Sequence, residues 1–230
     1  IIAEVSLTSV LSSASYSPTP GWNLIKNVTI ISSQASTSCF SATSSSTGHT
    51  YFRNCKFTYN GTGLPKIINQ SGFGKLSIES CVFDCTLNSS LSNDDVICIN
   101  YNPNGTLARE LFVQSSKFNI IGTASGTNIN ITAVLSTGTN LTGTYNAHIL
   151  DNTIIENTTA TSATKTAIEI DPSASSTAIN YVRNNSINIS GASTVSQGTL
   201  ITGNSTSITH ATNNTIIVSG ASFSNIGHVT

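Results

Sequence analysis

The chain has 230 residues, of which 8% are charged and 38% hydrophobic, and its formal net charge is -1. It lacks the basic surplus that attracts nucleic acids and anionic membranes, so we expect neither as a partner. No apolar run approaches the ~20 residues that cross a bilayer, and residues 1–5 lack the basic start of a signal peptide. The absence of methionine, even at position 1, suggests a processed or excised chain.

A six-residue pattern recurs at 25–30, 52–57, 78–83, 113–118, 149–154, 182–187 and 211–216. It is an apolar residue, an outward residue, a short polar residue, two more outward residues and an apolar residue. The two apolar residues cannot share one face of a straight strand, because side chains alternate with period two. A left-handed corner at the polar residue, which Asn and Asp tolerate best after Gly, turns both into one core. The predicted corners are Asn27, Asn54, Ser80, Ser115, Asp151, Asn184 and Asn213.

A second apolar run follows each of the first six corners after about 12 to 18 residues and predicts a third strand. These runs are 39–40, 67–68, 96–99, 131–135, 167–170 and 200–201. The segments between them are rich in Gly, Ser, Thr, Asn and Pro, which is turn and loop chemistry without helical periodicity. The sequence therefore predicts an all-β fold.

Three short strands per coil, one polar corner and loops of variable length resemble the right-handed parallel β-helix of the pectate lyase superfamily, phage tailspikes and bacterial surface passengers. The resemblance covers residues 21–230 and rests on the repeated corner pattern. It implies one solenoid domain over residues 1–230 with about seven coils, in which residues 1–20 form a strand and loop available for subunit contacts. It also implies that the corner side chains stack as a ladder of amide bonds from coil to coil, weakened in the middle by the Ser and Asp members.

The column three residues before each corner is predicted to point outward. Its members are Leu24, Tyr51, Ser77, Phe112, His148, Tyr181 and His210, so a stripe of rings (Tyr51, Phe112, His148, Tyr181 and His210) is predicted on one face. Exposed apolar patches often mark binding surfaces. Sugar stacking and contact with a neighbouring subunit are two interpretations, and rings lying under a loop are the third.

Few residues suggest catalysis. Asn93, Asp94 and Asp95 precede a strand, while Glu169 and Asp171 share a strand face at ~6 to 7 Å. That separation is near the range of an acid and base pair in glycoside cleavage, but the repeat places no cation beside Glu169, and solvated surface charges are favoured. The four histidines are dispersed without metal-binding spacing. We therefore expect no catalytic residue, metal or cofactor.

Five cysteines leave at least one unpaired. Cys55 and Cys81 occupy one column in adjacent coils, where a Cα separation of ~4.8 Å permits a disulfide, and two free thiols are the equal alternative. Cys85 and Cys98 can close the loop between them and leave Cys39 over. Asn-x-Ser/Thr sequons are frequent, but in a chain so rich in Ser and Thr they are only a weak signal for a glycoprotein.

Low charge, Ser, Thr and Asn richness and scarce catalytic residues favour a structural subunit of an extracellular, cell-surface or virion filament. The alternatives are a carbohydrate-binding or polysaccharide-cleaving tailspike or lyase, and a fragment of an adhesin passenger. Residues 1–7 and 225–230 are expected to be strands without a cap. We therefore expect other copies of the chain to cover the ends, head to tail or by strand exchange. The alternative is that the chain is a fragment of a longer β-helix.

Overall fold

A computed structural model gives the fold. It describes residues 22–32, 38–42, 48–63, 65–72, 74–93, 95–103, 109–138, 143–160, 162–171, 177–193, 195–201, 207–219, 223–225 and 228–229. All regular secondary structure within these ranges is β-strand, which confirms the all-β prediction.

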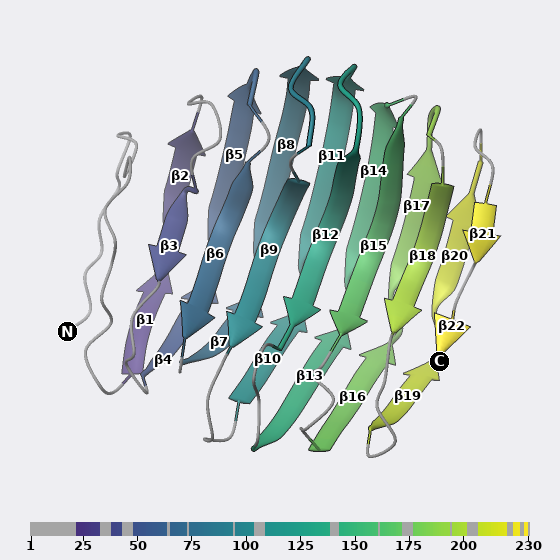
Figure 1. Ribbon diagram of the computed structural model, residues 1–230. Helices are drawn as coiled ribbons and strands as arrows, with labels where there is room; N and C mark the ends of the chain where they lie inside the picture. Colours follow the sequence, from purple (N-terminus) through teal and green to yellow (C-terminus); the bar gives the residue numbers. More distant parts are fainter. Residues whose placement is uncertain are drawn as a thin grey trace.

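The strands form three parallel sheets in which neighbours lie one coil apart along the chain (Figure 1). The first sheet contains β1 (Trp22–Lys26), β4 (His49–Arg53), β7 (Lys75–Glu79), β10 (Arg109–Gln114), β13 (Thr144–Leu150), β16 (Thr177–Arg183) and β19 (Ile208–Thr212). The second contains β2 (Thr29–Ser32), β5 (Lys56–Gly61), β8 (Val82–Ser89), β11 (Lys117–Ala124), β14 (Thr153–Thr159), β17 (Ser186–Ser190) and β20 (Thr215–Val218).

The third sheet contains β3 (Phe40–Ala42), β6 (Lys66–Gly72), β9 (Asp95–Pro103), β12 (Ile129–Thr137), β15 (Ala163–Asp171), β18 (Val195–Ile201) and β21 (Phe223–Asn225), and β22 (His228–Val229) also pairs with β18. The predicted third-strand runs all fall in this sheet. All strand pairings among the described residues are parallel, so the chain is a parallel β-helix with three strands per coil, as the sequence predicted.

Each predicted corner residue separates a first-sheet strand from a second-sheet strand and has left-handed backbone angles. The seven φ values lie between 50° and 57°. The corner N–H donates to a carbonyl of the next coil, as in the 3.1 Å bond from Asn184 N to Thr212 O. Asn93 and Asn128 also have positive φ, at 59° and 53°, and mark a second turn, before β9 and β12, that the repeat did not predict.

The apolar residues flanking the corners form the core or pack against it, as predicted, except Ala211 at the last corner, which is exposed. Phe57, Phe83 and Phe118 stack in one column, with ring centroids 4.9 and 4.7 Å apart and nearly parallel planes. Ile154 and Ile187 continue that column through the next two strands. Aromatic stacking adds about 0.5–1.5 kcal/mol per pair beyond the burial of apolar area, so this column ties successive coils together.

The residue directly after each corner points into the core, and its predicted outward orientation is wrong. The left-handed corner turns the chain so that the next side chain faces the same interior as the apolar residues around it. The buried members of this interior ladder are Val28, Cys55, Cys81, Ser116, Asn152 and Asn185, and Asn214 at its end is partly buried.

Three asparagines of the interior ladder satisfy one another and the backbone. Asn152 and Asn185 donate from Nδ2 to Oδ1 of the next asparagine at 3.0 Å, and their backbone N–H groups donate to the same oxygens at 3.0 Å. Asn214 is the last member, and its Nδ2 donates to Val182 O at 2.8 Å. The amide ladder that was predicted at the corners thus lies one residue further along the chain.

The corner side chains themselves bond less regularly. Asn184 Nδ2 donates to Asp151 Oδ1 at 3.0 Å, the one side-chain hydrogen bond between two of the seven corner residues that the structure describes. Gln114, from the strand before a corner, donates to the other oxygen of Asp151 at 3.3 Å. The corners therefore turn the chain chiefly through their backbone angles.

All five cysteines are buried free thiols, so the suggested Cys55–Cys81 disulfide and the Cys85–Cys98 pairing are not present in the structure. Cys55 and Cys81 are members of the interior ladder and bond along it instead. Cys55 N donates to Cys81 Sγ at 3.4 Å, and Cys55 Sγ donates to Ile25 O at 3.4 Å. These thiols thus form hydrogen bonds with backbone groups along the interior ladder, as the asparagine side chains do in later coils.

A buried ion pair lies between the second and third sheets and was not predicted. Lys165 Nζ lies 3.1 Å from Glu156 Oε2, with both side chains almost completely buried. The ammonium also donates to Thr158 O at 2.6 Å and Ser190 O at 2.7 Å. Burial, opposed by the partner charge, lowers the pKa of Lys165 and raises the pKa of Glu156. The pair with its carbonyl partners satisfies an ammonium that the core could not otherwise hold.

Candidate functional site

The predicted outward stripe runs along the outer face of the first sheet. Strand register places Leu24, Tyr51, Ser77, Phe112, His148, Tyr181 and His210 side by side in successive strands. These side chains are half-buried or exposed, whereas the residues that alternate with them in β4, β7, β10, β13 and β16 are buried. We call Phe112, His148, Tyr181 and His210 the ring column.

Rings of the ring column stack on one another. Tyr181 lies between His148 and His210, with centroids 5.0 Å away on each side and planes tilted by 22° and 10°. Phe112 and His148 are 5.8 Å apart and tilted by 41°. The two histidines therefore cover both faces of the Tyr181 ring, and only the edge of this ring is available to a ligand or partner. A sugar needs a free ring face to stack, so this geometry disfavours sugar stacking at the centre of the column.

Charged groups border the ring column. The Arg183 guanidinium lies 4.7 Å from the centroid of the Tyr181 ring, and a carboxylate oxygen of Glu110 lies 3.8 Å from His148 Nε2. Lys75 pairs with the same Glu110 at 3.1 Å. Burial lowers the pKa of His148, Glu110 opposes that shift and Arg183 adds to it. The face is therefore a row of ring edges within a network of charges.

His49 belongs to the same outer face. Its Nε2 lies 2.7 Å from Ser77 Oγ, and its ring is 6.4 Å from that of Tyr51. Burial lowers its pKa, the charge of Lys75 lowers it further, and Glu110 opposes both. The three histidines whose side chains are described, His49, His148 and His210, thus share one face, although no pair of them is adjacent in the same column.

The outer face of the third sheet carries the carboxylates. Glu169 lies in register between Leu135 and Leu200 on neighbouring strands. Burial raises its pKa, and the charges of Asp171 and then Asp95 raise it further. Strand register places Asp95 two strands away and level with Thr164, so Asp171 is the carboxylate that shares the end of β15 with Glu169.

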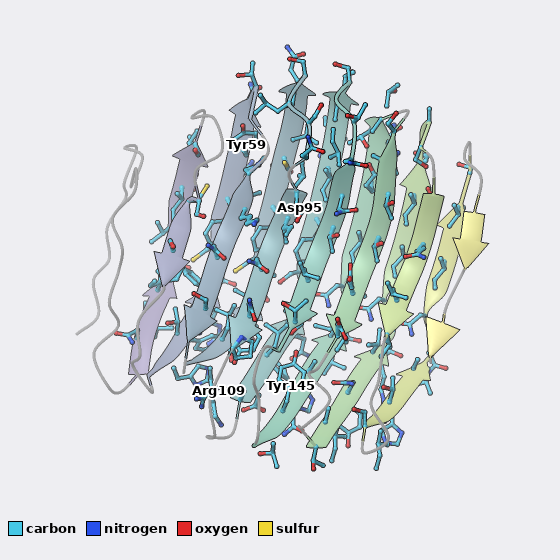
Figure 2. All side chains as sticks on the ribbon, viewed as in Figure 1. Tyr59, Asp95, Arg109 and Tyr145 are labelled. Atoms are coloured by element: carbon cyan, nitrogen blue, oxygen red, sulfur yellow. The ribbon has the colours of Figure 1, made fainter. Side chains whose placement is uncertain are left out.

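Amides accompany these carboxylates. Figure 2 places Asp95 at the start of β9, where Asn130 Nδ2 donates to its Oδ1 at 2.8 Å. Asn100 Nδ2 donates to Asn69 Oδ1 at 2.7 Å on the same sheet. Asp94, which was noted beside Asp95, lies outside the described residues. The face is an acidic and amide surface with two partly exposed leucines.

Within the described ranges no group of three or more His, Cys, Asp or Glu side chains is placed to hold a metal ion. No helix in that part of the chain is long and apolar enough to cross a membrane. Comparison of the chain with protein-family models, curated proteins and solved structures found no match. The candidate sites are therefore the two outer faces, that of the first sheet with its ring column and that of the third sheet with its carboxylates.

Proposed function

We propose that the protein is a structural subunit of an extracellular, cell-surface or virion fibre, in which the β-helix acts as a stiff spacer that contacts other copies of itself. The observation that carries this proposal is the unbroken register of the interior columns. The phenylalanine stack and the interior ladder join coil to coil, so that residues about 30 positions apart support one another across each strand boundary.

Such a rod resists bending because each coil is held by parallel backbone bonds and by side chains that bond to the coils on either side of it. Seven strands at ~4.8 Å spacing give a sheet about 30 Å long. Its sides offer regular rows of ring edges, amides and hydroxyls at that same spacing. A spacer needs a stable repeating shape rather than a binding pocket, and these regular rows supply such a shape.

Cys39 and Cys98 are compatible with an oxidising location because the core shields them, whereas the hydrogen bond with Cys81 lowers the pKa of Cys55 to about 7. Burial raises the pKa of Cys39 to about 12, although Ser32 opposes the shift, and burial also raises the pKa of Cys98. Thiols react as thiolates, so these groups are slow to oxidise while the chain is folded. Exposure of the thiols on unfolding is expected to end that protection.

Sedimentation velocity of the purified chain at rising concentration tests the fibre proposal. We expect species larger than one chain that grow with concentration, since subunits of a fibre must contact one another. A single species with the mass of one chain at every concentration would contradict it. The predicted head-to-tail contacts stay a prediction, because residues 1–21 lie outside the described residues.

Glycan cleavage is the second candidate, and one observation favours it. Burial raises the pKa of Glu169, and Asp171 lies two residues further along the same strand, as a general acid next to a base would require. A polysaccharide panel assayed for new reducing ends tests it. The expected result for a fibre subunit is no release, whereas release that is lost in Glu169→Gln and kept in Asp84→Asn, a carboxylate of the second sheet, would establish the enzyme.

A further inference from the structure

Two outer faces of the rod carry opposite charge. On the first sheet the cations outnumber the carboxylates, and these groups are Lys26, Arg53, Lys75, Arg183, Glu79 and Glu110. On the outer side of the third sheet the carboxylates outnumber the cations, and these groups are Asp95, Glu169, Asp171 and Lys66. The histidines of the first sheet add further positive charge where they are protonated.

Both faces also carry half-buried apolar groups at the same height along the rod. β13 and β15 belong to one coil, joined through β14, so His148 and Glu169 are at about the same level. Leu135 and Leu200 flank Glu169 just as Phe112 and Tyr181 flank His148. The two rows have the same strand spacing, so they can match without an axial shift.

We propose that a second copy of this chain docks its third-sheet outer face on the first-sheet outer face of its neighbour, with the two rods side by side and parallel. This proposal rests on the proposed fibre function and names the surfaces that join the subunits. In the contact His148 faces Glu169 of the neighbouring copy, and Arg183, one strand further along the rod, reaches toward the Glu169 and Asp171 of that copy. Because two different faces meet, each copy keeps both faces for further neighbours, and the contact can repeat sideways.

The size of the faces sets the strength of the contact. A face about 30 Å long and about 17 Å wide, the span of three outward residues, buries roughly 500 Å² on each copy. The total of roughly 1,000 Å² is at the lower limit for a specific interface. Charge pairs on such a surface are screened by salt, so the contact should be concentration-dependent and weaken roughly tenfold between low and high salt.

Three charge reversals test the pairing by sedimentation velocity of the full chain. Arg183→Glu reverses the first-sheet face, and Glu169→Lys reverses the third-sheet face. Lys117→Glu is the control, because it makes the same charge change as Arg183→Glu on an exposed position of the second sheet. Each reversal of a docking face should weaken association roughly tenfold or more, whereas the control should leave it unchanged.

Mixing the two weakened variants, Arg183→Glu and Glu169→Lys, is the most specific test of the pairing. In an equal mixture the reversed face of one variant meets the reversed face of the other, and their unchanged faces also match, so association should return to the parent level. Thermal melts check that each variant is folded. If Arg183→Glu unfolds early, Arg183→Gln, which removes this charge without reversing it, replaces it.

The other outcomes overturn the proposal in different ways. Loss of association in Arg183→Glu with full association in Glu169→Lys would show that the first-sheet face pairs with itself. If neither the three charge reversals nor added salt changes association, side-by-side docking is excluded. Contacts through the ends of the rod would then remain, and the proposed fibre function would stand. A chain that stays monomeric at every concentration would refute this docking and the fibre function together.

Discussion

Removing one asparagine from the interior ladder should destabilise the whole rod. Asn185→Ala deletes bonds to Asn214 Oδ1 and Ile149 O, at 3.0 and 2.9 Å, and two 3.0 Å bonds that Asn185 Oδ1 accepts from Asn152. Asn152 Nδ2 keeps its bond to Val113 O, so the groups that lose a ladder partner without a replacement are Asn152 N–H and Ile149 C=O. At about 1–3 kcal/mol for each unsatisfied buried group, the expected loss is about 2–6 kcal/mol.

Urea unfolding followed by circular dichroism measures this loss, with free energies taken from midpoints and the slope of the parent. Asn188→Ala is the matched control, because Asn188 lies on the next strand, β17, in the same coil but is exposed. The control should change the free energy of unfolding by less than about 0.5 kcal/mol. If the two variants differ by less than about 1 kcal/mol, the interior ladder does not hold the coils together as argued.

Three further predictions use the same unfolding assay. Asn184→Val places a β-branched residue at φ 57° and should cost about 1–2 kcal/mol, whereas Asn184→Gly should cost less. Lys165→Met should cost about 3–5 kcal/mol by leaving Glu156 buried and unpaired, and adding Glu156→Gln should restore part of this loss; equal stability of single and double variants would refute it. Burial lowers the pKa of His148, so the folded chain takes up that proton less readily than the unfolded chain, and stability should fall from about pH 7.5 to about pH 5.5, less so in His148→Phe; an equal fall would refute it.

The corners and the core could be predicted because they obey a local rule. A residue such as Asn184 between two apolar positions has few backbone solutions that bury both, and left-handed angles are the one that Asn accepts most readily. The register of Phe57, Phe83 and Phe118 followed directly from aligning those corners. Even the outward column, including His148, could be assigned by counting back from the corner.

Other features depend on what a corner does to the residues beside it. The sequence contained Asn152 and Asn185 in matching positions, but strand alternation alone assigned them to the outside, since it does not include the turn of the chain at the preceding residue. The Lys165 and Glu156 pair joins different strands of a coil, and no spacing within the repeat predicts it. Stacking of the rings, which covers the faces of Tyr181, likewise depends on side-chain tilt.

Negative-stain electron microscopy of the purified full chain over a range of concentrations tests the central claim, that this β-helix is a structural subunit, most directly. The account predicts uniform fibres or bundles of rods whose number and size increase with concentration, because in the proposed fibre the sides of each rod contact other copies. Isolated single rods at every concentration would contradict it.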